Sequence, residues 1–277
     1  MSFSVSAQYH SLCWRITGSG LKQPSYLYGT MHVSDRRVFN FGDKVMKAFD
    51  ASKAYAMELD PDKMFNPAVA LSLIMKDGSR ISQMLPDSDY RFADSVVRST
   101  TGIGLAPLDR VEPVLITAML EEGSMGVAST DTGNMSEEMD LYFYRKAKSQ
   151  KKKQIGIETV DEQIAALHTL SYQEQADQLR DAIEQMRHPE GATDKDLLKY
   201  YIDQDLDSLL SMSDDAKMPD KFYKALVTDR NIRMADRIAE FVRKQPTFIA
   251  IGALHLPGQG GVIELLRRKG YKVEEWK

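Results

Sequence analysis

Six short segments of the chain combine apolar, β-branched and aromatic residues in brief runs. Each run is bounded by glycine, proline, serine or charged residues, a pattern that is typical of strands rather than of helices. The predicted strands are Cys13–Thr17, Ser25–Thr30, Ala54–Leu59, Lys153–Glu158, Thr247–Ile251 and Tyr271–Trp276. Most of them lie near one end of the chain or the other, so we expect the two ends to form one sheet.

Between these strands, apolar residues recur at the spacing of amphipathic helices. The predicted helices are Gly42–Ala51, Asn66–Met75, Ser88–Thr100, Glu112–Glu121, Met135–Lys148, Val160–Thr169, Tyr172–Met186, Asp194–Met212, one or two helices over Lys221–Arg243, and Gly261–Lys269. Strand–helix–strand alternation at both ends predicts an α/β fold. We expect a central, mostly parallel or mixed sheet from the N- and C-terminal parts, with a large helical insertion. A single domain is expected over residues 8–277, mainly helical in 61–150 and 160–245.

One stretch breaks the helical pattern of the middle region. The sequence "EEGSMGVASTDTGNMSEEMD", residues 121–140, holds small and polar residues with no period. It predicts a loop, and a loop beside a site can act as a lid.

Composition narrows the function classes. Net charge is −4 over 277 residues and no basic stripe is present, so nucleic acid is not an expected partner. Cys13 is the only cysteine, which excludes an intrachain disulfide and a cysteine-rich zinc site. No apolar run has the length of a transmembrane helix. Homo-oligomerisation is left open.

The first residues resemble the end of a secretory signal. Val5-Ser6-Ala7 precedes Gln8 in the small-residue pattern of a cleavage site, so residues 1–7 are interpreted as a signal remnant. This predicts an exported protein, periplasmic or associated with the cell envelope of a bacterium. The alternative is an ordinary N-terminal segment of a cytoplasmic protein.

Two histidines share one setting more than two hundred residues apart. "YLYGTMHVS" and "FIAIGALHLPG" each read as an apolar strand, then G-x-x-H, then a loop. His32 and His255 are therefore predicted on loops after strand ends, where open α/β sheets bind ligands. Gly29 and Gly252 allow a sharp turn or a close approach. The alternative for each histidine is an ordinary surface or hydrogen-bonded role.

Two carboxylates are predicted at further strand ends. Glu58 and Glu158 each close an apolar strand, and the alternative for both is a helix cap or a surface ion pair. With His32 and His255 they form a donor set that suits Zn²⁺, Mn²⁺, Co²⁺ or Fe²⁺ with positions open for water. A helix over "TDRNIRMADRI" carries Arg230, which could hold a substrate carboxylate or be an ordinary exposed helix charge.

Five stretches together resemble the TraB/GumN family, which includes metal-dependent proteases of the TIKI type. They are "YLYGTMHVS", "AMELD", "MDLYFYRKAKSQKKKQIGIETVDEQ", "DRNIRMADRI" and "FIAIGALHLPGQGGVIELLRRKGYKVEEW". The resemblance implies the fold of erythromycin esterases and ChaN-like haem-binding proteins.

The resemblance also implies an activity. It points to metal-dependent hydrolysis of a peptide or protein substrate, with a divalent metal for which Mn²⁺ or Co²⁺ is favoured and Zn²⁺ or Fe²⁺ remains open. Catalytic and metal-binding roles fall on His32, Glu58, Glu158 and His255, and substrate binding on Arg230 and Asn231. The alternatives are an esterase, or a protein that binds a peptide, haem or metal without turnover.

Overall fold

The structure is a computed structural model of the chain. It describes residues 9–33, 35–64, 67–127, 139–188, 194–215 and 218–276. Residues 1–7, interpreted above as a signal remnant, and the expected start at Gln8 lie outside the described residues.

A six-stranded mixed sheet forms the centre of the molecule, in the order β4-β3-β5-β2-β1-β6. The strands are β1 (Cys13–Gly18), β2 (Ser25–Thr30), β3 (Ala54–Met57), β4 (Lys153–Gly156), β5 (Thr247–Gly252) and β6 (Tyr271–Glu275). Neighbours pair in parallel from β4 to β2, whereas β1 is antiparallel to both β2 and β6. The predicted α/β fold with a mostly parallel or mixed sheet is confirmed.

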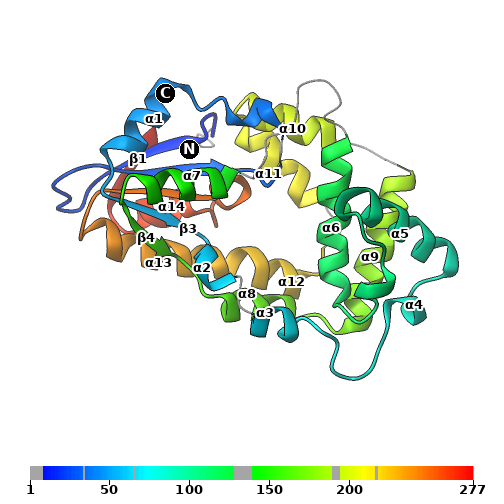
Figure 1. Cartoon of the computed structure of the whole chain (residues 1–277). Coiled ribbons are helices and arrows are strands. Elements are labelled where there is room, and N and C mark those ends of the chain that lie inside the picture. Colours follow the sequence, from blue (N-terminus) through cyan, green and yellow to red (C-terminus); the bar gives the residue numbers. More distant parts are fainter. Residues whose placement is uncertain are drawn as a thin grey trace, which may run out of the picture.

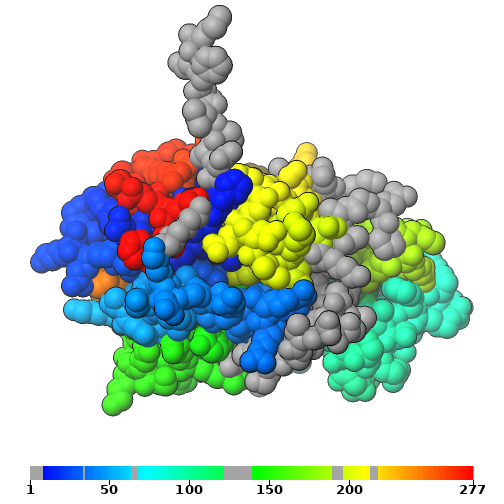
Figure 2. Space-filling model, turned by 90° about the horizontal axis from the view of Figure 1, so that it is seen from above, coloured from blue at the N-terminus to red at the C-terminus, as the bar shows by residue number. Residues whose placement is uncertain are grey.

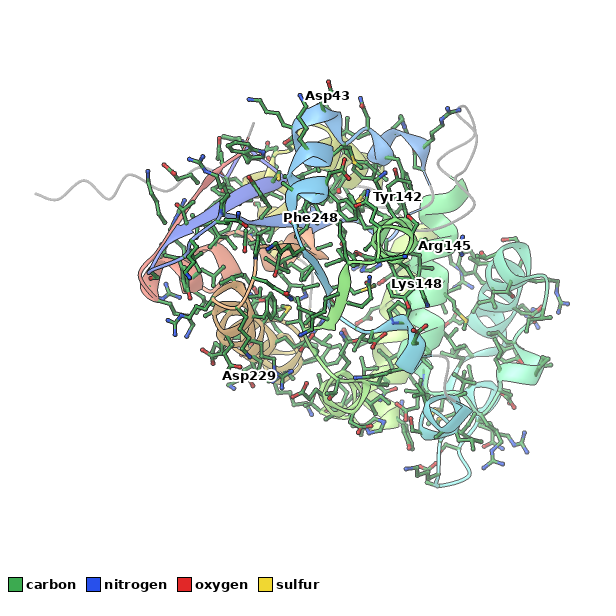
Figure 3. The ribbon with its side chains drawn as sticks, turned by 60° about the vertical axis from the view of Figure 1, so that its left-hand side comes forward. Asp43, Tyr142, Arg145, Lys148, Asp229 and Phe248 are labelled. Carbon is green, nitrogen blue, oxygen red and sulfur yellow. The ribbon has the colours of Figure 1, made fainter. Side chains whose placement is uncertain are left out.

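Helices cover both faces of this sheet, which explains why β2 and β5 are buried almost throughout. On one face lie α1 (Gly42–Ala51) and α7 (Met139–Ser149). Phe248 of β5 is in the interior beneath them, with its ring centroid 5.3 Å from that of Phe49 and 5.2 Å from that of Phe143 (Figure 3). On the other face lie α13 (Asp229–Val242) and α14 (Val262–Arg268) (Figure 1).

The chain leaves the two central strands toward opposite faces. From β2 it crosses through α1 to β3, and from β5 it crosses through α14 to β6, on the other side of the sheet. Parallel crossovers are right-handed, so connections that run in opposite directions along a sheet must use opposite faces. Open α/β sheets bind ligands beyond the carboxyl ends of the strands at the point where this happens. Here that point lies between β2 and β5, and we call the region beyond these two strand ends the crevice.

A group of helices at the right of Figure 1 has a hydrophobic core of its own. It is built from α4 (Ile81–Met84), α5 (Asp87–Thr101), α6 (Pro113–Val127) and α9 (Tyr172–Arg187). Its buried residues, such as Ile116 and Ile183, belong to a different cluster from the residues that pack on the sheet. The shorter helices around it are α2 (Pro61–Met64), α3 (Pro67–Ser72), α8 (Val160–Leu167) and α12 (Asp220–Tyr223).

Two further helices, α10 (Asp194–Ile202) and α11 (Leu206–Asp215), connect this helical group with the sheet. Figure 2 shows their yellow surface beside the blue N-terminal and red C-terminal segments. The backbone N–H of Leu206 donates to the carbonyl of Tyr9 at 3.0 Å, and that of Leu12 donates to Gln204 Oε1 at 3.2 Å. In the described part of the chain, no helix combines the length and apolar character needed to cross a membrane.

Several predicted boundaries were wrong for identifiable reasons. The predicted loop over residues 121–140 is helical at both described ends: α6 continues to Val127, and α7 begins at Met139. Residues 128–138 lie outside the described residues. The glycines of this stretch predicted an earlier end because glycine has a weak helix propensity. The earlier turns of α6 are held in the helical core by Ile116 and Leu120. Strands β3 and β4 also end earlier than predicted, so that Glu58 and Glu158 follow the strands rather than close them.

The helix predicted over Asp194–Met212 is two helices. Gln204 has a left-handed backbone with φ of 59°, which interrupts the first helix. The carboxylate of Asp205 then accepts from the N–H of Ser208 at 3.1 Å, a contact that starts the next helix. The region Lys221–Arg243 is likewise divided into α12, a π-helix η3 (Lys224–Thr228) and α13.

Candidate active site

Both G-x-x-H motifs lie at the same edge of the sheet, at the crevice between β2 and β5. Parallel pairing places Gly29 opposite Ile251 and Thr30 opposite Gly252. His32 follows β2 by two residues, and His255 ends a short 3₁₀ helix, η4 (Ala253–His255), directly after β5. The side chain of His32 is 59% exposed and that of His255 only 12%, so the two histidines occupy different depths.

The two motif glycines have different physical roles. A Cβ on Gly29 would lie 2.8 Å from Leu256 Cδ1 and 3.1 Å from the Cα of Ala253, so this glycine lets η4 pack against β2. A Cβ on Gly252 would lie 3.3 Å from Glu58 Oε1, so the second glycine makes room for a carboxylate. The first motif therefore packs against the second, and the second holds Glu58.

Glu58 connects the end of β3 to the second motif and to α13. Its Oε1 accepts from the N–H of Gly252 at 2.7 Å, and its Oε2 accepts from Arg230 Nη2 at 2.6 Å. Burial alone would raise the pKa of this carboxyl group. Four neighbours outweigh burial and lower the pKa of Glu58 to about 2, namely His255, Arg230, His32 and the N–H of Gly252. Glu58 is therefore a carboxylate throughout the neutral range.

Arg230 bridges Glu58 and Glu158, the residues that follow β3 and β4. Its Nε donates to Glu158 Oε2 at 2.8 Å, and its Nη1 donates to the carbonyl of Leu226 in the π-helix η3 at 3.3 Å. Glu158 also accepts from Arg233 at 3.4 Å and from Gln163 at 3.3 Å, and its side chain is fully buried. Both oxygens of Glu158 are thus engaged by protein donors. π-Helical turns often occur at functional sites, and this one comes directly before the helix that carries Arg230.

Asn231, next to Arg230 in α13, contacts the second histidine rather than the open crevice. Its Oδ1 lies 2.6 Å from Nδ1 of His255, and its Nδ2 donates to the carbonyl of Gly260 at 2.9 Å. Burial lowers the pKa of His255, the charge of Glu58 opposes this change, and Arg230 reinforces it. The net lowering favours neutral His255 at pH 7.

Asp140, in the first turn of α7, is a site residue that the sequence reasoning missed. Its Oδ2 lies 3.4 Å from Nδ1 of His32 and accepts from the hydroxyl of Thr30 at 3.3 Å. The side chain is 13% exposed. Asp140 falls at the end of the predicted loop and inside the predicted helix Met135–Lys148, away from any predicted strand end, so its pattern carried no distinct signal. Its place in the quoted stretch "MDLYFYRKAKS" was the one available hint.

A family model described as the TraB/PrgY/gumN family matches residues 12–275. The chain belongs to this family. The resemblance noted from its motifs is therefore confirmed over nearly the whole sequence.

Curated relatives of this TraB/PrgY/gumN chain are named as metalloproteases. It is 28% identical over 303 residues to Metalloprotease TIKI1 of Danio rerio, covering 91% of this chain and 60% of the relative. It is 26% identical to Metalloprotease TIKI2 of Xenopus tropicalis, covering 91% and 57%, and 24% identical to Metalloprotease TIKI2 of Danio rerio, covering 96% and 61%. The chain thus spans about three fifths of the length of these relatives. No solved structure matches it.

The family relationship implies a divalent metal, and the donor atoms at the crevice are chemically suited to one. His255 Nε2 and Glu58 Oε1 face each other at 4.0 Å, and the His32–Asp140 pair lies at the same edge. Imidazole and carboxylate are the usual ligands of Zn²⁺, Mn²⁺, Co²⁺ and Fe²⁺. Across the described ranges, no three or more His, Cys, Asp or Glu side chains are already grouped as a metal site.

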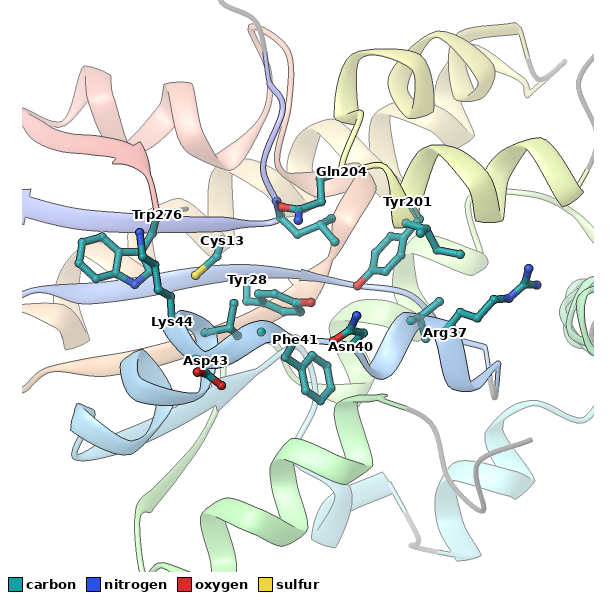
Figure 4. Close-up of a pocket in the computed structure, with 15 residues that line it drawn as sticks. Cys13, Tyr28, Arg37, Asn40, Phe41, Asp43, Lys44, Tyr201, Gln204 and Trp276 are labelled. Atoms are coloured by element: carbon teal, nitrogen blue, oxygen red, sulfur yellow. Dashed lines mark hydrogen bonds between the residues drawn. The ribbon is translucent and has the colours of Figure 1, made fainter. Parts of the chain in front are cut away.

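A pocket of about 660 Å³ borders the first motif on the α1 face of the sheet (Figure 4). Aromatic residues form much of its lining, including Tyr28, Phe41, Tyr201 and Trp276. Tyr201 also donates its hydroxyl hydrogen to the carbonyl of Gly29 at 2.8 Å. This hydrogen bond therefore joins the lining of the pocket to the glycine of the first G-x-x-H motif.

Proposed function

We propose that this protein is a metal-dependent hydrolase that cleaves peptides or exposed protein segments at the crevice between β2 and β5. The observation that carries the proposal is the pair His255 Nε2 and Glu58 Oε1, 4.0 Å apart. Glu58 is ionised, and His255 Nε2 offers an electron pair when the ring hydrogen is on Nδ1, the nitrogen that Asn231 Oδ1 contacts at 2.6 Å. Two acceptors held face to face are suited to a shared cation.

Within this proposal, His255, Glu58 and His32 hold the divalent cation. When bound, the cation polarises a substrate carbonyl and lowers the pKa of a water molecule. Both oxygens of Glu58 already accept hydrogen bonds, from Gly252 N–H and Arg230, and these contacts favour the charged form over uptake of a proton. We therefore assign Glu58 to cation binding and electrostatic stabilisation rather than to general-base catalysis.

Glu158 and Arg230 support this group of donors through a network of ion pairs. The guanidinium of Arg230 lies 2.6 Å from Glu58 Oε2 and 2.7 Å from Glu158 Oε2, so it keeps Glu58 charged and directs its other oxygen toward His255. Glu158 holds Arg230 in place and contributes to the site through it. Removing one partner of such a buried network leaves an uncompensated charge, which is strongly destabilising.

The test is a peptide-library digest by purified protein, with and without added Mn²⁺ or Co²⁺. We expect metal-stimulated cleavage that EDTA abolishes. Glu58→Gln, His32→Ala and His255→Ala should each reduce kcat/KM by at least about a hundredfold. The matched control is Glu162→Gln: Glu162 is also paired with an arginine, Arg237, at 2.6 Å and also has a pKa of about 2, but it lies in α8 outside the donor group. This control should retain near wild-type kcat/KM.

One observation favours a second candidate, a protein that binds a peptide or metal without turnover. Both oxygens of Glu158 are occupied by protein donors, which leaves fewer carboxylate oxygens for a cation. Metal and peptide binding measured by calorimetry, with no cleavage of any library member under any metal, would establish this alternative and reject the hydrolase. Full activity in folded Glu58→Gln would remove Glu58 from the proposed chemistry.

A further inference from the structure

The side-chain amide of Asn231 connects His255 to a tightly folded loop. Asn231 is 3% exposed, so its amide contacts are shielded from water. The loop carbonyl that it binds, on Gly260, precedes Gly261, where a Cβ would lie 2.1 Å from the carbonyl oxygen of Pro257. The loop also closes on itself through Gly261 N–H, which donates to the carbonyl of Gly258 at 3.0 Å. Because the loop is crowded, we expect the Gly260 carbonyl to keep its orientation.

That carbonyl determines which way the amide of Asn231 points. A carbonyl oxygen only accepts, so the NH₂ end of the amide faces Gly260, at 2.9 Å. The amide oxygen must then face His255 Nδ1, at 2.6 Å. Since an amide oxygen also only accepts, the imidazole nitrogen facing it must carry the hydrogen.

A neutral imidazole has one N–H, so a hydrogen on Nδ1 leaves the electron pair on Nε2. Nε2 is the atom that faces Glu58 Oε1 at 4.0 Å. In water, a neutral imidazole favours the opposite tautomer, with its hydrogen on Nε2. That tautomer would direct an N–H at Glu58 and leave no electron pair there.

We propose that Asn231 is a positioning residue that holds the ring hydrogen of His255 on Nδ1 and directs the Nε2 electron pair into the crevice beside Glu58. The role deepens the proposed hydrolase, on which its consequence for activity rests. It differs from the substrate-binding role expected from the sequence, because the amide is occupied at both ends by the protein itself.

The neutral amide suits this task better than a carboxylate would. A carboxylate at this position would favour imidazolium, in which both ring nitrogens carry hydrogen. The other motif shows the contrast, since His32 has the carboxylate of Asp140 at its Nδ1, at 3.4 Å. The two histidines therefore have partners of different charge.

The direct test is the imidazole ¹⁵N spectrum of metal-free, ¹⁵N-histidine-labelled protein at pH 8, with His255 assigned by comparison with His255→Gln. We expect a protonated Nδ1 and an unprotonated Nε2 in the wild type. Asn231→Leu, which removes both amide contacts at similar volume, should shift His255 toward the Nε2–H tautomer. Asn231→Asp retains an oxygen facing Nδ1 and should retain the hydrogen on Nδ1.

Two functional readouts accompany the spectrum. Loss of an orienting partner typically lowers metal affinity or activity by about 10–100-fold, so Asn231→Leu should weaken Co²⁺ binding in calorimetry by that factor. The matched control is Gln175→Met, which removes another buried amide, one that donates to Glu112 and to the carbonyl of Leu170 at 3.3 Å in the helical group. It should leave the His255 spectrum and Co²⁺ affinity unchanged, which separates positioning from general loss of stability.

The outcomes are distinguishable from failure of the hydrolase proposal. An Nε2–H wild-type His255 overturns the positioning role, even if Asn231→Leu does not fold. So does an unchanged tautomer in folded Asn231→Leu. If Asn231→Leu changes the His255 tautomer but leaves Co²⁺ affinity and cleavage unchanged, the positioning role is rejected and the hydrolase proposal stands. Absence of cleavage in the wild type rejects the hydrolase, and the spectrum still decides the tautomer.

Discussion

At the residue scale, three carboxylates near the crevice have three different environments. Glu158 is fully buried and saturated by arginines and a glutamine, whereas Glu58 is shared between Arg230 and the second G-x-x-H motif. Asp140 faces the exposed histidine, His32. Glu58 and Glu158 both contact Arg230, and they differ in their other donors, a backbone N–H for Glu58 and the side chains of Arg233 and Gln163 for Glu158.

Asp140 provides a prediction at this scale. Asp140→Asn keeps the shape of the side chain but removes the negative charge 3.4 Å from His32 Nδ1. We expect kcat/KM for peptide cleavage to fall by about 10–100-fold, the usual effect of changing a partner that orients a ligand. Steady-state kinetics with the best library peptide measures this, and thermal unfolding should change little.

The matched control is Asp236→Asn on the exposed surface of α13, where Asp236 pairs with Lys269. Surface pairs contribute about 0–1 kcal/mol, so this variant should match the wild type in both assays. Equal kinetics for Asp140→Asn and the wild type would place Asp140 outside the site.

At the element scale, the site depends on how two short connections pack together. The turn η4 carries His255 and rests on β2, and the contact is close because Gly29 has no side chain. The π-helix η3 precedes α13, and the first turn of α13 presents Arg230 and Asn231 to Glu58 and His255, respectively. The site is therefore assembled from the ends of elements, each of which is positioned by the sheet or by α13.

Gly29→Ala tests the contact between β2 and η4. The new Cβ would lie 2.8 Å from Leu256 Cδ1 and 3.1 Å from the backbone of Ala253, so η4 must move away. Overpacking of this kind typically costs about 1–3 kcal/mol, which we expect in the free energy of unfolding in urea. Because η4 ends in His255, metal affinity should fall as well.

Gly260→Ala is the control for the loss of conformational freedom that any glycine replacement causes. A Cβ at Gly260 would meet nothing within 4 Å, so its free energy of unfolding should change by less than about 1 kcal/mol. If Gly29→Ala is as stable as Gly260→Ala, the close packing of β2 and η4 is not required for stability.

At the scale of the whole molecule, the chain forms two hydrophobic cores. One packs the helices α1, α7, α13 and α14 on the sheet, and the other lies within α4, α5, α6 and α9. Regions with separate cores can open with different free energies. The candidate site belongs to the sheet core, and we expect the helical group to be stabilised independently of it.

Ile183→Ala tests this independence. Ile183 is fully buried in the helical core, and such truncations cost about 2–5 kcal/mol. Hydrogen exchange should show lost amide protection in α5, α6 and α9, while β2 and β5 keep theirs. The matched variant Ile238→Ala, fully buried in the sheet core, should instead reduce protection of the strands. Identical protection losses across the molecule for both variants would indicate one cooperative unit.

The sequence by itself determined the α/β class, the six strands and most of the longer helices, because apolar periodicity depends on local spacing and burial. It also identified the two G-x-x-H motifs and Glu58 as candidate site residues, since strand ends can be located from the apolar runs before them. It did not reveal the break at Gln204, where a long-range hydrogen bond joins Leu12 N–H to the Gln204 side chain, or the extension of α6 to Val127.

Only the tertiary structure decided how the candidate residues are paired. Strand order places Glu58 beside Gly252, 194 residues away, and α13 returns to place Arg230 between two carboxylates. The tertiary structure also places Asn231 beside Nδ1 of His255 and Asp140 beside Nδ1 of His32. Such pairings depend on which strand ends become neighbours in the sheet and on the direction of each helix, and neither is encoded in local spacing. For this reason residue types near a site can be predicted from sequence, whereas their protonation and partners require the fold.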